Sequence, residues 1–174
     1  MIQKYSRYKV LQQFFDSPRK AFLIREISRN VTLSVPSVRL HLKALLTEGL
    51  ISKEKTSLYP SFRAVRDSQT FKILKTQNVV LRISQTGLLL IIERVCYPSC
   101  IVLFGSASRG EDTEESDIDL FVQAKEVKID VGKFERVLNR RINFLFEPDV
   151  KAVSPELLNN LANGSVLYGY LKVV

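Results

Sequence analysis

Cysteine and histidine are scarce in this chain, and their scarcity excludes a common class of metal site. The 174 residues include two cysteines, Cys96 and Cys100, and one histidine, His41, which lies far from them in sequence. A zinc site needs about four ligands, so these residues do not form one. Two buried, reduced thiols are the simpler interpretation, and a disulfide across the short gap is the alternative.

Long apolar runs are also missing. The longest, Leu88 to Ile92, is far too short to span a bilayer. The first residues show no charged, apolar and small-residue segments in the order of a signal peptide. Apolar residues make up 45% and charged residues 25% of the chain, which is ordinary for a globular protein. We expect a cytoplasmic protein with no membrane contact.

The positive charge is concentrated in the first third of the chain. Residues 1–66 contain 13 Lys and Arg against 4 Asp and Glu, whereas residues 67–174 contain 13 against 14. The first segment therefore carries almost all of the net charge of +8. Such a local excess is typical of a segment that binds nucleic acid.

Apolar spacing in this basic segment predicts three short helices followed by two strands. The helices are expected at 5–15, 23–31 and 35–47, with Ser34 as the N-cap of the third. The two β-like stretches are 50–55 and 61–65. The stretch Ser37 to Leu45, with Gly49-Leu50-Ile51 after it, resembles the recognition helix and wing of ArsR/MarR-like winged-helix regulators.

That resemblance implies DNA binding through the third helix, which would enter the major groove. The candidate DNA-binding residues are exposed polar and basic side chains on this helix and on the wing: Ser37, Arg39, Lys43, Lys53 and Lys55. Lys53 and Lys55 have an alternative interpretation as solvated charges on a strand edge. His41 is expected to pack within the helix, and Leu40 falls on its exposed side. A homodimer is the default expectation, because such regulators often bind symmetric half-sites.

The remaining chain divides into a helical linker and an α/β region. Residues 67–98 are expected to be helical and to join a winged helix at 1–66 to a domain at 99–174. In that domain, strands are expected at 101–104, after Asp117 and at 142–146, with helices at 131–140 and from Ser154 onward.

Residues 105–122 carry the most specific pattern. Gly105-Ser106 closes an apolar run, and Asp117-Ile118-Asp119 opens the next one after ten intervening residues. Side chains alternate along a strand, so both aspartates project from one face. Two neighbouring carboxylates repel each other unless a cation neutralises them, and Mg²⁺ prefers such oxygen ligands together with phosphates. The pattern indicates a phosphoryl-transfer site; an Asp-capped turn between two strands is the alternative.

The same residues resemble the GS-x10-DxD signature of nucleotidyltransferases related to DNA polymerase beta, especially the small minimal ones. Arg109-Gly110 and Ser116 also match residues usual inside that signature. The resemblance implies an α/β (α+β) nucleotidyltransferase domain with a small mixed sheet, here preceded by the winged-helix domain. It implies Mg²⁺ or Mn²⁺ at Asp117 and Asp119, and an NTP held by Gly105, Ser106 and Arg109.

One expected carboxylate is missing. The two-metal mechanism of this family draws on a third acid, which follows a basic and an apolar residue at the start of the next strand. Asn143 stands there, in Arg141-Ile142-Asn143. Its carbonyl oxygen can coordinate a metal, but its amide has no charge and cannot accept the hydroxyl proton.

No other acid replaces it convincingly. Glu147 shares the face of Asn143, but four strand residues separate them by ~13 Å. Glu114 and Glu115 lie in the loop before Asp117 and are expected to be solvated, and Glu135 is expected to be an exposed helix residue.

Three functions therefore stay open. The first is an active nucleotidyltransferase that transfers a nucleoside monophosphate from NTP to a hydroxyl on protein or nucleic acid. The second is a DNA-binding transcriptional regulator whose transferase domain binds nucleotide with little or no catalysis. The third is an antitoxin that modifies a HEPN-type ribonuclease toxin, which ranks lower because those antitoxins generally lack a winged helix.

Overall fold

The computed structural model describes residues 5–54 and 59–172. The chain divides into two compact units, Met1–Lys75 and Thr76–Val174. The boundary between them lies inside helix α4 (Gln69–Thr86). Lys55, one of the predicted DNA-binding residues, lies outside the described residues.

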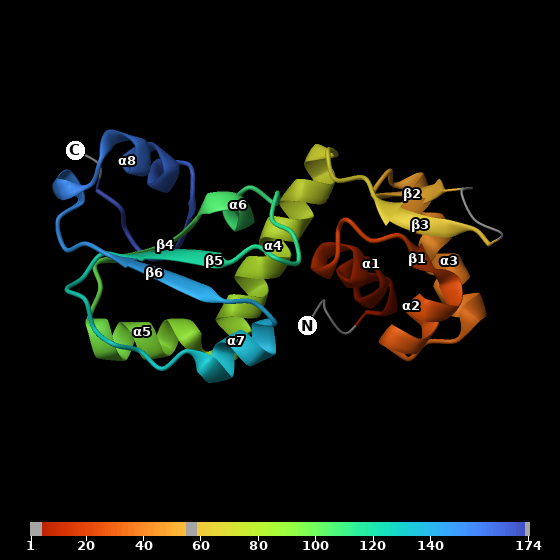
Figure 1. The fold of residues 1–174 in the computed structure, drawn as a ribbon, viewed down its shortest axis with the longest axis horizontal. Coiled ribbons are helices and arrows are strands. Elements are labelled where there is room, and N and C mark those ends of the chain that lie inside the picture. The colour runs from red at the N-terminus through yellow and green to blue at the C-terminus, as the bar shows by residue number, and fades with distance from the viewer. Residues whose placement is uncertain (1–4, 55–58, 173–174) are drawn as a thin grey trace. The chain divides into compact units, whose positions relative to one another are not determined.

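The first unit combines a helical layer with a small antiparallel sheet in the order β1-β3-β2 (Figure 1). Ser34 caps the third helix as predicted, because its hydroxyl accepts a hydrogen bond from the Ser37 N–H. The two strands predicted from the sequence pair with each other, and a two-residue strand before the second helix joins them. The elements are α1 (Ser6–Asp16), β1 (Phe22–Leu23), α2 (Ile24–Val31), α3 (Val35–Thr47), β2 (Ile51–Glu54) and β3 (Ser61–Ala64).

Apolar side chains of all three helices and of the sheet form one core in this unit. Phe14 packs edge-on against Phe22, and Phe15 packs at a tilt against Phe71. Leu42 and Leu45 of α3 are fully buried, whereas Leu40 on the same helix is 67% exposed. The third helix therefore packs through one side and leaves the side of Leu40 open, as its spacing predicts.

The second unit is built on a four-stranded mixed sheet in the order β6-β5-β4-β7. β4 is antiparallel to both of its neighbours, and β5 runs parallel to β6, so the small mixed sheet predicted from the sequence is confirmed. No helix among the described residues is both long and apolar enough to cross a bilayer. The elements are α5 (Leu88–Cys96), β4 (Cys100–Phe104), α6 (Gly105–Ser108), β5 (Ile118–Val122), α7 (Gly132–Leu138), β6 (Ile142–Phe146), the short 3₁₀ helix η2 (Val150–Ala152), α8 (Pro155–Ala162) and β7 (Ser165–Gly169).

The two faces of this sheet have different coverings. α5 and α7 lie against one face and α8 against the other (Figure 1). Ile118, Leu120 and Val122 of β5 join the core on the α5 and α7 side, and Phe121 joins the core on the α8 side. Alternation along β5 therefore directs Asp117 and Asp119 to the face of Phe121.

Both cysteines are free thiols. Cys100 is buried in β4 and Cys96 is partly buried at the end of α5. Burial raises the pKa of both thiols, so they stay protonated and weakly nucleophilic at neutral pH.

Candidate functional site

Three polar side chains meet where β5 and β6 begin. Asp119 of β5 is the register partner of Asn143 on β6. The Asn143 amide Nδ2 donates to Asp117 Oδ2 over 3.1 Å and to Asp119 Oδ1 over 3.2 Å. The predicted carboxylate pair and the amide that stands in the third-acid position are thus brought together on one face.

The shared donor shows that the two carboxylates converge. A single nitrogen lies within hydrogen-bonding distance of one oxygen from each aspartate. Carboxylates held this close repel each other, and the amide protons partly offset that repulsion. A divalent cation bound by the same two oxygens would offset it more strongly, so the two side chains fit a hard cation such as Mg²⁺ or Mn²⁺.

Gly105 is required beside this pair for two reasons. It connects β4 to α6 with a φ of +71°, a conformation that other L-residues rarely adopt. In addition, a Cβ at this position would lie 2.6 Å from Asp119 Oδ2. The glycine therefore leaves room for the Asp119 carboxylate as well as for the turn.

The short helix α6, which begins at Gly105, is fixed to α4. The Thr76 hydroxyl donates to the carbonyl oxygens of Ala107 and Ser108 over 3.4 and 3.3 Å. Ser106, a predicted nucleotide-binding residue, is partly buried on this helix next to Gly105. Arg109, the third predicted nucleotide-binding residue, forms an ion pair of 3.0 Å with Glu111, and both side chains are about half exposed.

A buried ion pair holds the loop that leads to Asp117. Arg140 Nη1 lies 2.7 Å from Asp112 Oδ2, with the Arg140 side chain 10% and the Asp112 side chain 0% exposed. The same nitrogen donates to the Ser116 carbonyl over 3.4 Å. Neither residue was selected from the sequence, because their spacing gives no sign that they meet. Arg140 thus connects the end of α7 to the residue before Asp117.

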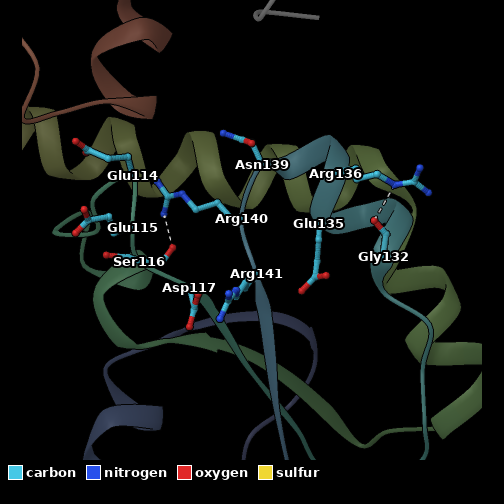
Figure 2. Close-up of a pocket in the computed structure, with 10 residues that line it drawn as sticks. All are labelled: Glu114, Glu115, Ser116, Asp117, Gly132, Glu135, Arg136, Asn139, Arg140 and Arg141. Atoms are coloured by element: carbon cyan, nitrogen blue, oxygen red, sulfur yellow. Dashed lines mark hydrogen bonds between the residues drawn. The ribbon is translucent and has the colours of Figure 1, made fainter.

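A charged cleft of about 630 Å³ opens beside Asp117 (Figure 2). The loop before β5 contributes Glu114 and Glu115, and the α7 side contributes Arg136 and Arg141 among its lining residues. Acidic and basic groups face this space together. The two glutamates are therefore near Asp117, as loop residues of the cleft wall.

Glu135 and Glu147 are engaged elsewhere. The expectation that Glu135 is an exposed helix residue is wrong, because it is partly buried and its Oε1 accepts from the Ile142 N–H over 2.9 Å. Glu147 Oε1 accepts from the Asp149 N–H over 3.1 Å. Among the residues that the structure describes, no group of three or more His, Cys, Asp and Glu side chains is arranged to hold a metal ion.

The predicted DNA-binding residues of the first unit lie on α3 and β2. Arg39 and Lys43 are exposed on α3, and Lys53 is exposed on β2. Ser37 is partly buried, and its hydroxyl lies 3.4 Å from His41 Nε2. The two basic residues of α3 are thus available to solvent, whereas Ser37 and His41 interact within the helix, as expected for His41.

Two further arginines line a cleft with Arg39. This cleft measures about 790 Å³, and Arg25 and Arg29 of α2 are on its wall, together with Tyr59 and Leu23. Arg25 and Arg29 are exposed and four residues apart, so they share one side of α2. These two arginines were not among the residues selected from the sequence, although their spacing within the basic segment could have indicated them.

Replacing Gly105 by alanine tests the space beside Asp119. Gly87→Ala is the matched control, because Gly87 has a φ of +78° but no atom within 4 Å of its ideal Cβ. Both variants should lose roughly 1 kcal/mol of unfolding free energy from backbone strain. Only Gly105→Ala should also weaken Mn²⁺ binding, by about 10-fold or more, because Asp119 must move. Calorimetric Mn²⁺ titration measures this, and equal Mn²⁺ affinities in the two variants would contradict it.

Removing the Arg140 charge tests the buried ion pair. Arg140→Met should lower the unfolding free energy of the second unit by about 3–5 kcal/mol, because the buried Asp112 charge loses this partner. Arg141→Met is the matched control; Arg141 is exposed, so its change should stay within about 0.5 kcal/mol. Urea denaturation followed by circular dichroism gives both values. Similar small losses in both variants would show that the pair contributes little.

Comparison with known proteins supports the fold of the second unit. Residues 89–169, just under half of the chain, match the family model described as polymerase beta, nucleotidyltransferase. No curated protein sequence matches the chain.

Two solved structures also resemble part of the chain. One is described as a toxin-antitoxin with AMP-PNP; it is 22% identical, has a TM-score of 0.38, and the match covers 52% of this chain and 73% of that one. The other is a mutant of the toxin-antitoxin MntA-HpeT, 19% identical with a TM-score of 0.35, covering 55% of this chain and 73% of that one.

The site geometry and the family match agree on the same segment. Gly105, Asp117, Asp119 and Asn143 all lie within the matched range. Residues 89–169 form a nucleotidyltransferase domain of the polymerase beta type.

Proposed function

We propose that the second unit binds a nucleoside triphosphate with Mg²⁺ and transfers the nucleoside monophosphate to a hydroxyl acceptor. The observation that carries this proposal is the convergence of Asp117 and Asp119 on the Asn143 amide. Oxygen atoms arranged in this way suit a hard divalent cation that also binds phosphates. The family match over the same residues supports the same reaction.

Each site residue has a definable role in this reaction. Asp117 and Asp119 would hold Mg²⁺ or Mn²⁺, which neutralises phosphate charge when bound. Gly105 adjoins Asp119 and Ser106 follows it in α6, and both are assigned to the triphosphate. Arg109 would join them by leaving Glu111, because its exposed ion pair is weak.

In this transfer one bond to the α-phosphorus forms and one breaks. The acceptor oxygen forms a bond to the α-phosphorus, the bond from that phosphorus to the bridging oxygen breaks, and pyrophosphate leaves. The hydroxyl proton passes to water or to a carboxylate, because the neutral amide of Asn143 cannot accept it.

Asn143 favours a second candidate function. A DNA-binding transcriptional regulator could use the same site to bind nucleotide with little or no turnover. The position that usually supplies a third carboxylate is occupied here by Asn143, whose amide donates hydrogen bonds to the carboxylates of Asp117 and Asp119. This candidate and the active transferase differ in rate, and both require nucleotide binding.

Incubation with labelled NTPs, Mg²⁺ and cell lysate distinguishes the two candidates. Transfer by the wild type should fall at least about 100-fold in Asp119→Ala, which loses a metal ligand. Asp130→Ala, a change of an exposed aspartate in the same unit, is the matched control and should retain activity. Label that appears only in Asn143→Asp would support the nucleotide-binding regulator. Transfer that persists in Asp119→Ala would contradict the site.

The same assay tests the acceptor. A purified HEPN-type ribonuclease toxin added in place of lysate examines the antitoxin function implied by the resemblance. Label on that toxin would identify a protein acceptor. Label on nucleic acid would instead place the acceptor in the other class left open by the sequence.

We infer that the first unit contains a winged-helix domain at 1–66 that binds DNA. A helical linker at 67–98 joins it to the nucleotidyltransferase domain at 99–174. The order of helices and strands in the first unit and its basic charge support this inference. Arg39 and Lys43 on α3 are exposed, and Arg25 and Arg29 line a cleft with Arg39. In this arrangement α3 would contact the major groove while α2 contacts phosphates. Two half-sites would be bound by a homodimer.

DNA binding should depend steeply on salt. Arg39→Ala and Lys43→Ala should each weaken binding and reduce the slope of log affinity against log salt by about 1 if the lost contact is to a phosphate. Lys9→Ala, which removes an exposed lysine from α1, is the matched control and should bind as the wild type does. Fluorescence anisotropy at several salt concentrations measures these slopes. Affinity for DNA that is independent of salt, or no binding to DNA at all, would contradict the proposed DNA-binding function.

A further inference from the structure

The candidate site has few side chains that could coordinate two cations. Two-metal sites in phosphoryl transfer hold both ions between shared carboxylates and the substrate's phosphates. Here two carboxylates and one neutral amide converge. No third acid joins them among the described residues, where no cluster of three or more metal-binding side chains is found.

The orientation of the Asn143 amide makes the electrostatic potential of the site less negative. Asn143 turns its Nδ2 toward both carboxylates. To help hold a cation, the amide must rotate and present its oxygen, which is a neutral ligand. Asn143 can therefore complete the coordination of a cation already bound by the aspartates, but it adds no charge to attract another.

Arg141 places a positive charge on the same side of the strand. It precedes Ile142, the register partner of Ile118, and its carbonyl accepts from the Ile118 N–H over 2.9 Å. Arg141 therefore lies opposite Asp117 and, two residues before Asn143, shares its face. Figure 2 shows the Arg141 side chain beside that of Asp117. A guanidinium group here opposes the binding of additional cations.

The other nearby acids do not restore the charge. Glu135 is bonded to the Ile142 N–H at the start of β6, and Glu147 is bonded to the Asp149 N–H at its end. Glu114 and Glu115 line the cleft beside Asp117, but both are exposed on the loop, where solvent screens their charge. The formal charge of Asp117, Asp119, Asn143 and Arg141 together is −1.

We propose that this site holds one divalent cation per chain, the one shared with the nucleotide's phosphates, and that Asn143 prevents binding of a second. One divalent cation balances the two carboxylates, and the triphosphate supplies its remaining ligands. A second divalent cation would share these ligands with the first and would face Arg141. The inference rests on the proposed nucleotide-binding function and departs from the two-cation arrangement that the sequence resemblance implies.

Counting bound Mn²⁺ by electron paramagnetic resonance tests this inference without relying on turnover. The full chain is titrated with Mn²⁺ in the presence of α,β-methylene analogues of ATP, GTP, CTP and UTP in turn, because the bond that would break is then blocked. The wild type should bind one Mn²⁺ per chain with the analogue that it accepts. Asn143→Asp should bind two and show spin coupling between them.

A matched variant separates position from charge. Asn139→Asp adds a carboxylate to the wall of the same cleft, at a residue that is exposed and not paired with Asp119. It should continue to bind one Mn²⁺ per chain. Circular dichroism of each variant shows that the fold is retained.

The outcomes are distinguishable. Two Mn²⁺ bound to the wild type would overturn the single-cation inference and leave the proposed nucleotide binding intact. No Mn²⁺-dependent binding of any analogue would overturn the proposed function itself. One Mn²⁺ in Asn143→Asp would overturn the assignment of Asn143 as the residue that limits the count.

Discussion

The repulsion between the carboxylates of Asp117 and Asp119 is the constraint on which the rest of the site depends. Strand alternation places them on one face, and the turn at Gly105 leaves the space that Asp119 occupies. Without a cation, the Asn143 amide offsets part of the repulsion by donating to both. A cation would therefore displace amide protons from an arrangement that is already ordered, so little reorganisation of the aspartates is needed.

This order originates at the start of β6, where four interactions converge. Glu135 of α7 accepts a hydrogen bond from the first N–H of the strand. Arg140 is paired with the buried Asp112 and donates to the Ser116 carbonyl. The Arg141 carbonyl accepts from the Ile118 N–H. These contacts fix the beginning of β6 against the beginning of β5. The register of Asp119 with Asn143 follows from them. The α7–β6 connection thus determines which residue faces the carboxylates.

Much of this could be predicted from the sequence, since the strongest signals are local. Helical spacing, the Ser34 cap and the apolar runs of β4 and β5 each depend on residues near one another in the chain. The carboxylate pair and Asn143 were identified because strand alternation and the GS-x10-DxD resemblance both specify positions. By contrast, β1 and β7 were not predicted. β1 has two residues and exists through pairing with β3, while β7 carries exposed side chains and is held by pairing with β4.

The ion pair between Asp112 and Arg140 could not be predicted for a related physical reason. A buried charge is stable only beside its partner, and the partner is brought there by the β5–α7–β6 path, not by sequence spacing. The same β5–α7–β6 connection places Asn143 opposite Asp119. A change from carboxylate to amide alters one atom of one side chain, yet at this register position it converts an acceptor of cations into a donor to both aspartates. The fold of the site is thereby kept while its charge, and with it its demand for cations, is reduced.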